Sequence, residues 1–271
     1  MQKTVFILGC NSDIGAFLSK KWLDDGCRVV GTYRKSNEKL RHLKGQGLEA
    51  VQVEFGSCIS RETIIELTQR ANNWDIFLSC IGSLQPLELF SEANIDDWTN
   101  AFDANFTHQV RVLHELLNIT SVGSKNSRTI LFLAGGAMNS ATKFMSAYSI
   151  AKIALTKFVE LCQFENPDDK FSIIGPGWIN TKIHQQTLDA GHVTTEISEL
   201  TIKRLKTGDF NSVEKLAQMI EWVISSPVEI VGGRNFSLSA DNWADKNLIE
   251  ALSEDSDLFK LRRKQMDGDV S

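Results

Sequence analysis

The feature that most constrains the fold is a regular alternation of short apolar runs with longer amphipathic stretches. Strands are predicted where β-branched and aromatic residues gather in runs, over residues 4–9, 27–33, 48–55, 75–82, 129–136, 171–177 and 235–240. Helices are predicted where apolar residues recur three and four positions apart, over 15–26, 60–73, 96–121, 146–165 and 212–226. Strands that alternate with helices join through right-handed crossovers. The sequence therefore predicts a single doubly wound α/β domain of Rossmann type, with a parallel sheet of about seven strands and helices on both faces.

Composition narrows the classes of function. With 271 residues the chain can bury one sizeable core, and a net charge of -5 gives no sign of nucleic-acid or membrane-surface binding. No apolar run approaches the ~20 residues of a membrane span. The five cysteines are scattered and form no CxxC pair, which indicates reduced thiols. We therefore expect a cytoplasmic protein that binds neither nucleic acid nor membrane.

Two regions depart from the alternation. Residues 182–206 are polar and irregular, and a long irregular loop in a compact domain is usually functional or mobile. We expect residues 182–207 to form a lid loop over a substrate. Residues 243–271 are highly charged and are predicted to form a C-terminal tail outside the domain, which spans residues 1–242.

The first predicted strand runs directly into a glycine-rich loop, and a helix is predicted straight after it. Gly9 and Gly15 frame this loop, so its backbone can approach a pyrophosphate whose charge faces the helix N-terminus. Asn11 and Ser12 could add hydrogen bonds to phosphate or ribose. Asp13 is compatible with binding only if its carboxylate turns away from the phosphates, toward free N–H groups at the helix start. The alternative is a tight turn in which Ser12 or Asp13 caps the helix.

The second predicted strand indicates which dinucleotide such a loop would hold. Sites that prefer NAD usually have an acid near the end of this strand, where it accepts hydrogen bonds from the ribose hydroxyls. Here the strand ends in VVGTYRKS, with Arg34 and Lys35 and no acid. Because an arginine can pair with a 2′-phosphate, NADPH is favoured over NADH. The alternative is that both cations are solvated surface residues.

The chain has only two tyrosines, and one of them opens the sequence YSIAK. Tyr148 and Lys152 are one helical turn apart on the same face of the predicted helix. With this pair, the chain resembles a short-chain dehydrogenase/reductase of the compact single-domain type over roughly residues 1–242. LGCNSDIG resembles that family's TGxxxGIG loop, with Asp13 in place of the middle glycine. DIFLSCIG stands where the family has DxLVNNAG, and FDANFTHQV carries Asn105 at the position of a family asparagine. GPGWINT matches the family's PGxxxT.

The resemblance implies a role for each matching residue. Tyr148 would exchange a proton with the substrate oxygen, Lys152 would hold the nicotinamide ribose, and Asn105 would anchor a water that links the lysine to solvent. A tyrosine ordinarily has a pKa of about 10, and the ammonium and the oxidised nicotinamide are expected to lower this pKa. The implied cofactor-binding residues are Gly9, Asn11, Ser12, Asp13, Ile14, Gly15, Arg34, Gly82, Tyr148, Lys152, Pro176, Gly177, Trp178, Ile179 and Thr181.

One residue that the resemblance implies is absent. The family usually has a serine 13 residues before the tyrosine, and this chain has Gly135 there. Loss of one transition-state donor typically slows catalysis ~10²–10³-fold. Either a hydroxyl or amide from a rearranged loop replaces it, or a backbone N–H does, or the protein binds cofactor without turnover. The candidate replacements are Asn139, Ser140, Ser146 and the backbone of Gly135 or Gly136.

The sequence therefore predicts an NAD(P)-dependent oxidoreductase that transfers hydride between nicotinamide and a carbonyl or alcohol on a small polar substrate. Candidate substrate contacts are Gly135, Asn139 and His184. No histidine has metal-ligand spacing, so we expect no metal site. The resemblance also implies a homodimer or homotetramer, with residues 96–117 and 146–165 in the interface. Two alternatives stay open: a non-catalytic NADP(H)-binding sensor, and an enzyme acting on an activated sugar.

Overall fold

Seven parallel strands form one sheet in the order β3-β2-β1-β4-β5-β6-β7. The computed structural model describes residues 2–54, 60–118, 127–135, 141–190 and 195–263. The strand order reverses beside β1, as in doubly wound folds. The predicted Rossmann-type fold is confirmed, because each predicted strand contributes one strand of the sheet.

The elements have the following bounds. The strands are β1 Thr4–Leu8, β2 Arg28–Tyr33, β3 Glu49–Gln52, β4 Ile76–Ser79, β5 Thr129–Leu133, β6 Lys170–Gly175 and β7 Asn235–Ser237. The helices are α1 Asp13–Asp24, α2 Glu38–Gly45, α3 Arg61–Arg70, α4 Ile95–Asn105, α5 Thr107–Asn118, α6 Ser146–Glu165, α7 Ile183–Asp189, α8 Thr195–Thr207, α9 Val213–Ser225, α10 Val228–Val231 and α11 Lys246–Glu254.

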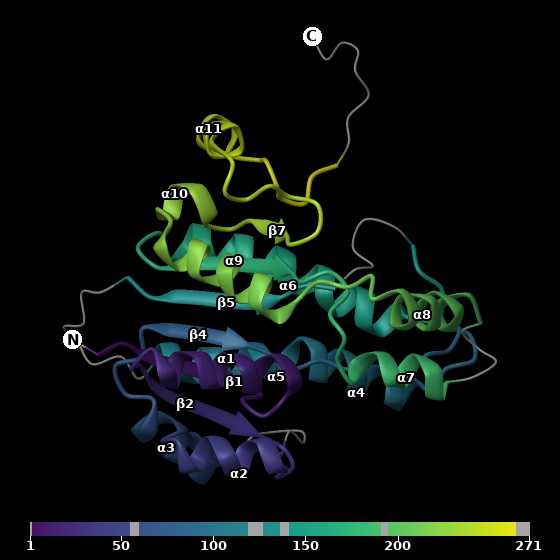
Figure 1. Ribbon diagram of the computed structural model, residues 1–271, viewed down its shortest axis with the longest axis horizontal. Helices are drawn as coiled ribbons and strands as arrows, with labels where there is room; N and C mark the ends of the chain where they lie inside the picture. Colours follow the sequence, from purple (N-terminus) through teal and green to yellow (C-terminus); the bar gives the residue numbers. More distant parts are fainter. Residues whose placement is uncertain (1, 55–59, 119–126, 136–140, 191–194, 264–271) are drawn as a thin grey trace.

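Helices cover both faces of the sheet and divide the core into two parts (Figure 1). Successive side chains of a strand point to opposite faces. In β1, Val5 and Ile7 therefore pack with α1 and α9 on one face, while Phe6 and Leu8 pack with α3, α5 and α6 on the other. This two-sided burial explains why the strands read as continuous apolar runs rather than as alternating patterns.

The carboxyl ends of the central strands meet at one edge of the sheet. Leu8 at the end of β1 pairs in register with Thr32 of β2 and Ser79 of β4. Helices α7 and α8 lie beyond the arrowheads of the strands, at this same edge (Figure 1). Ligands of open α/β sheets bind outside the carboxyl ends where the strand order reverses, so this edge is the place to look for a site.

Two predictions about helices are wrong. The single helix predicted over 96–121 is broken, because Phe106 leaves the helical region with φ -133° and ψ -72°, and α5 starts afresh at Thr107. The segment 182–206, predicted to be irregular, contains α7 and α8. In α8, Ile197 packs against an apolar cluster and Thr201 is buried, and this four-residue spacing is hard to see in the sequence because one of the two is polar and apolar neighbours such as Leu200 are exposed.

The charged C-terminal segment also contains a helix, and as far as residue 263 it packs against the sheet. Leu252 of α11 is buried, and Phe259 contacts the core beside β7. The guanidinium of Arg234, itself buried, donates to the carbonyl oxygens of Leu252, Asp255 and Leu258 at 2.6–3.1 Å. This cation therefore attaches the segment to β7.

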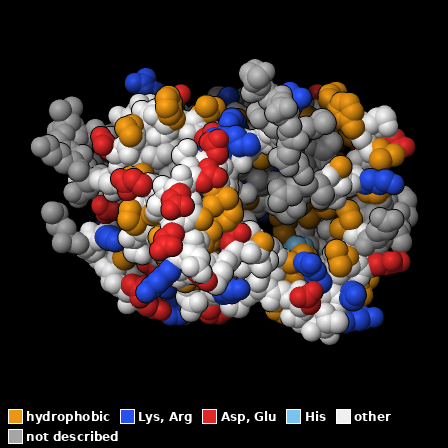
Figure 2. Space-filling view, turned by 90° about the horizontal axis from the view of Figure 1, so that it is seen from above, with side chains coloured by type: hydrophobic (Ala, Val, Ile, Leu, Met, Phe, Trp, Pro, Cys, Tyr) orange, Lys and Arg blue, Asp and Glu red, His pale blue; other side chains and the backbone are white. Residues whose placement is uncertain are grey.

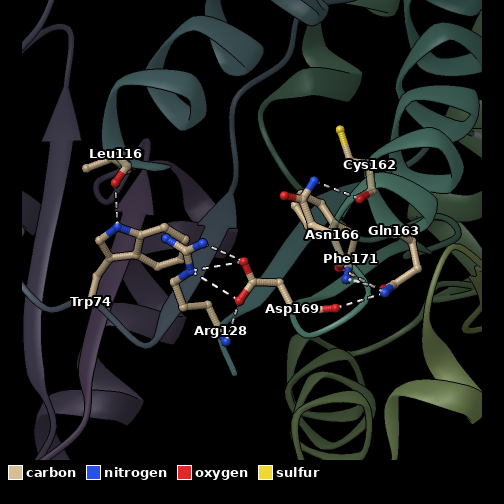
Figure 3. Close-up of polar contacts among 8 residues, drawn as sticks. All are labelled: Trp74, Leu116, Arg128, Cys162, Gln163, Asn166, Asp169 and Phe171. Carbon is tan, nitrogen blue, oxygen red and sulfur yellow. Dashed lines mark hydrogen bonds and ion pairs between the residues drawn. The ribbon is translucent and has the colours of Figure 1, made fainter. Parts of the chain in front are cut away.

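A polar cluster links the starts of β5 and β6 at the amino-terminal edge of the sheet, opposite the carboxyl edge (Figure 3). The Arg128 guanidinium pairs with both oxygens of Asp169, and its Cζ lies 5.0 Å from the centroid of the Trp74 ring. The Trp74 indole N–H donates to the Leu116 carbonyl. Arg128 and Asp169 stand just before β5 and β6, so their ion pair fixes the relative start of two strands far from the carboxyl edge.

Candidate active site

The glycine-rich loop packs directly against the end of β4. Gly9 has φ +86°, and a Cβ there would lie 2.6 Å from Cγ2 of Ile81. A Cβ at Gly15 would lie 2.1 Å from the Gly9 carbonyl oxygen. Both positions therefore exclude a side chain. Ser12 caps α1, because its hydroxyl accepts a hydrogen bond from the Gly15 N–H at 3.0 Å.

Asn11 holds the loop to the segment that follows β2. Its side-chain amide donates to the Lys35 carbonyl at 2.8 Å, and its own carbonyl accepts from the Asn37 side chain at 3.1 Å. The Arg34 side chain is exposed, and within the described residues it forms no ion pair. Asn11 thus joins the glycine-rich loop to the end of β2 and the start of α2, while Arg34 faces solvent.

Asp13 does not direct its carboxylate at the N–H groups of its own helix. One oxygen accepts from the Lys39 ammonium at 2.5 Å and the other from the Lys182 backbone N–H at 2.8 Å. Burial alone would raise the pKa of Asp13, but these two donors outweigh it and hold the pKa below its usual value. Asp13 therefore joins the glycine-rich loop to α2 and to the start of α7.

Tyr148 and Lys152 lie in the first two turns of α6, where the helix passes the ends of β4 and β5. The Lys152 side chain is 4% exposed, its Nζ donates to the Leu133 carbonyl at 2.9 Å, and it lies 5.8 Å from the centroid of the Tyr148 ring. The phenol is half-buried beside Leu84, Leu87 and Met145. The two predicted catalytic residues are therefore neighbours.

The expected lowering of the tyrosine pKa is wrong for the protein's own groups. Burial raises the pKa of Tyr148 to about 12. Burial also lowers the pKa of Lys152 to about 8, with a small opposing effect from Cys80. Desolvation disfavours the charged form of either group, so burial moves the two pKa values in opposite directions.

Asn105 is fully buried at the end of α4, where the helix breaks. Its Oδ1 accepts from the Ser83 N–H at 3.0 Å, and its Nδ2 donates to the carbonyl oxygens of Ser83 and Ala101, both at 2.8 Å. A Cβ at Gly82 would lie 3.2 Å from this Oδ1 and 3.8 Å from Lys152 Nζ. Asn105, Gly82 and Lys152 are thus neighbours.

Sequence reasoning missed the residue that supports Asn105. Gln109 is fully buried, and its Nε2 donates to the Asn105 carbonyl at 2.6 Å. The Ser79 hydroxyl donates in turn to Gln109 Oε1 at 2.6 Å. Ser79 stands where the family has an asparagine. Its hydrogen bond to Gln109 links the end of β4 to α5, just after the break between α4 and α5. A polar residue one turn after Asn105 was the only signal, and it is a weak one.

Gly135 lies against the phenol. A Cβ at this position would come within 2.7 Å of Tyr148 Oη and Cε1. Among the candidate replacements for the missing serine, the hydroxyl of Ser146 accepts from the Trp98 indole N–H at 2.9 Å. Asn139, Ser140 and Gly136 lie outside the described residues.

The segment 176–181 follows β6 and leads to α7. Gly177 has φ +65°, and a Cβ there would lie 2.4 Å from the side-chain nitrogen of Asn211. The Asn211 backbone N–H donates to the Trp178 carbonyl at 2.8 Å, and Ile179 is buried. These contacts hold the segment in a fixed turn between β6 and α9.

Trp178 stacks on His184, the predicted substrate contact, with ring centroids 3.9 Å apart. Burial, and to a smaller extent the Arg204 guanidinium, lowers the pKa of His184. Asp13, Thr181 and His184 line an open groove of about 670 Å³ beside α7. Predicted cofactor and substrate residues therefore meet along this groove.

Helices α7 and α8 contact the region around Tyr148. Ile183 and Ile197 pack with the phenol in the same apolar cluster, and Gln186 Oε1 accepts from the Leu84 N–H at 2.8 Å. Figure 2 shows hydrophobic side chains gathered around a hollow on the right of the molecule, the side where Figure 1 has these helices. Gln186 was not foreseen, because no sequence motif marks it.

Two further findings concern other kinds of site. None of the helices in the described part of the chain is both long and apolar enough to cross a membrane. Across the described ranges, no group of three or more histidine, cysteine or acidic side chains could hold a metal ion.

Comparison with known proteins identifies the family. The model of the short chain dehydrogenase family matches residues 3–191. The uncharacterized oxidoreductase YvrD of Bacillus subtilis is 25% identical over 185 residues, which are 65% of this chain and 69% of that protein. The solved KRED1-Pglu enzyme has a TM-score of 0.76 at 21% identity, covering 86% of this chain and 100% of that one. A variant of actinorhodin polyketide ketoreductase, solved with NADPH, has a TM-score of 0.73 at 17% identity, covering 87% and 95%. The chain therefore belongs to the short-chain dehydrogenase/reductase family, whose members are oxidoreductases.

Proposed function

We propose that this protein is an NADP-dependent reductase of a carbonyl group on a small polar molecule, with Tyr148 as the proton donor. The observation that carries the proposal is the position of the phenol. It lies beside Lys152 and under α7 and α8, at the carboxyl edge where the glycine-rich loop also lies. Asn105 and Gly82 complete this arrangement on the side of β4.

The residues at this edge fit a dinucleotide. Gly9 and Gly15 leave no room for side chains, so a pyrophosphate can approach the backbone at the start of α1. The negative charge of Asp13 is paired with Lys39, and this pairing reduces its repulsion of a phosphate. The cofactor would supply a hydride. Lys152 and the segment 176–181, including Thr181, would hold its nicotinamide end.

Arg34 supports the preference for NADPH over NADH. Its guanidinium is exposed after β2, and no described acid pairs with it, so it is available to a 2′-phosphate. The polyketide ketoreductase compared above was solved with NADPH. The structural neighbour and the free cation point to the same cofactor.

The protonation of Tyr148 favours reduction over oxidation. With a pKa of about 12, the phenol carries its proton at neutral pH. It can then donate this proton to the oxygen of a carbonyl as the carbon receives hydride. The reverse reaction would need a phenolate, which burial disfavours. Ketone or aldehyde reduction is therefore the proposed direction.

Three broader properties belong to the same proposal. Helices α7 and α8 would act as the substrate lid in place of the predicted loop, since their apolar residues reach the phenol. A homodimer or homotetramer would bury the exposed apolar residues of α6, which include Leu161 and Phe164. A cytoplasmic location agrees with the free cysteines.

Two measurements test the proposal. Fluorescence titration with NADPH and NADH should give tighter binding of NADPH. A screen of carbonyl substrates should give turnover in the wild type and a loss of at least ~10²-fold in Tyr148→Phe, because the acid is removed. Tyr33→Phe changes the only other tyrosine and is the matched control. Cofactor binding with equal turnover in wild type and Tyr148→Phe would refute the role of Tyr148, and binding without any turnover would favour the sensor.

A further inference from the structure

The space beside Gly135 is filled by the phenol of Tyr148. A Cβ added at this glycine would lie 2.7 Å from Oη, 2.7 Å from Cε1 and 2.9 Å from Cζ of the ring. Real Cβ atoms essentially never approach other heavy atoms this closely. The edge of the ring therefore occupies the volume in which any side chain at position 135 would begin.

The backbone does not itself require glycine at position 135. Gly9 and Gly177 have φ of +86° and +65°, whereas the φ of Gly135 lies outside the left-handed region. Its φ therefore imposes no requirement for glycine. The contact with the phenol is the reason for glycine that the structure shows.

Other contacts hold the phenol at this place. The ring packs against the cluster of Leu84, Leu87 and Met145. Lys152, one turn along α6, is tied to the Leu133 carbonyl, two residues before Gly135. Lys152 and the ring of Tyr148 therefore both contact the chain at the end of β5.

We infer that Gly135 is a positioning residue: its missing side chain allows the Tyr148 hydroxyl to lie where the family's serine side chain would begin. This inference rests on the proposed function. In the family, a tyrosine hydroxyl and a serine hydroxyl usually share this region. Here the Tyr148 hydroxyl occupies it alone, so the site requires glycine at position 135. Restoring a serine would move the phenol and would not repair the site.

The first test compares Gly135→Ala with Gly135→Ser. If Gly135 positions the phenol, both variants lose kcat/KM by ~10²-fold, since a displacement of about 1 Å at a reacting group can cost that much. If the glycine is only a lost donor, serine gains activity over the wild type, by up to ~10²–10³-fold, and alanine does not. Gly45→Ala is the matched control, because a Cβ there meets nothing within 4 Å. Higher activity in Gly135→Ser overturns the inference.

The second test follows the phenol without substrate or cofactor. In a Tyr33→Phe background Tyr148 is the only tyrosine, so tyrosinate absorbance reports this residue alone. With a pKa of about 12, about 10% of the phenol is ionised at pH 11, compared with about 90% for an unperturbed tyrosine. Gly135→Ser should shift the midpoint downward as the ring moves toward solvent, with circular dichroism at the same pH showing that the fold persists.

The two tests separate failure of the inference from failure of the proposed function. An unchanged midpoint in Gly135→Ser shows that the ring has not moved, and this overturns the inference even if the wild type is an active reductase. A downward shift of the midpoint supports the inference even if no substrate is reduced.

Discussion

The burial of Lys152 should cost the protein stability, and its replacement by methionine should restore it. Burial lowers the pKa of Lys152 from 10.5 to about 8. At pH 7 a difference of this size corresponds to about 3 kcal/mol of lost stability, at 1.36 kcal/mol per pKa unit. Removing the hydrogen bond to the Leu133 carbonyl costs about 1 kcal/mol. Lys152→Met should therefore raise the free energy of unfolding by about 2 kcal/mol, while removing activity.

The sign of the effect depends on pH. Between pH 8 and 10.5 the folded wild type binds fewer protons at Lys152 than the unfolded chain does, so its stability rises with pH through this window. The methionine variant has no such group, and its advantage should shrink as pH rises toward 10.5. Urea unfolding of both proteins at pH 7, 8, 9 and 10 measures this difference. At pH 7 the midpoint of thermal unfolding should rise by about 4–8 °C.

Lys157→Met provides the matched control, because Lys157 is on the same helix with a side chain 46% exposed. Its stability should change by no more than ~0.5 kcal/mol. The reasoning is refuted if Lys152→Met is no more stable than the wild type at pH 7 and the two proteins keep parallel stability curves up to pH 10.

Three further predictions concern the cofactor, the reaction and the C-terminal segment. Arg34→Ala should weaken NADPH binding by roughly ten- to a hundredfold, the value of a charge-assisted hydrogen bond, and should leave NADH binding nearly unchanged in fluorescence titration. The rate of carbonyl reduction should fall as pH rises through about 8, because the buried ammonium of Lys152 loses its proton there, and a profile flat to pH 10 would exclude a role for that charge. Arg234→Met should lower the free energy of unfolding by about 3 kcal/mol or more, since three carbonyl oxygens lose a charged donor; urea unfolding within 0.5 kcal/mol of the wild type would contradict this.

The parts of the fold set by local pattern were predictable. The central strands, such as residues 4–8 and 129–133, are buried on both faces and therefore read as unbroken apolar runs. The pair Tyr148 and Lys152 was found because helical spacing brings the two side chains together, whatever surrounds them. The position of Gly135 was equally visible by counting back from the tyrosine.

What could not be predicted depends on contacts between distant segments. Asp13 is held by Lys39 and Lys182, which are 26 and 169 positions away, and no local pattern indicates either partner. The pKa of Tyr148 depends on burial by residues from three separate segments. The space beside Gly135 is occupied by a side chain from another element, so only the three-dimensional structure shows that this space is filled.

The C-terminal segment also covers the outer edge of β7, the last strand of the sheet. The amide of Asn235 in β7 donates to the Phe259 carbonyl at 2.9 Å, and that of Ser237 donates to the Asp241 carboxylate at 2.6 Å. An outermost strand with unpaired amides is a template for adding a strand from another molecule. Because this chain satisfies those amides with its own later residues, loosening that segment would expose a surface prone to self-association before the rest of the domain unfolds.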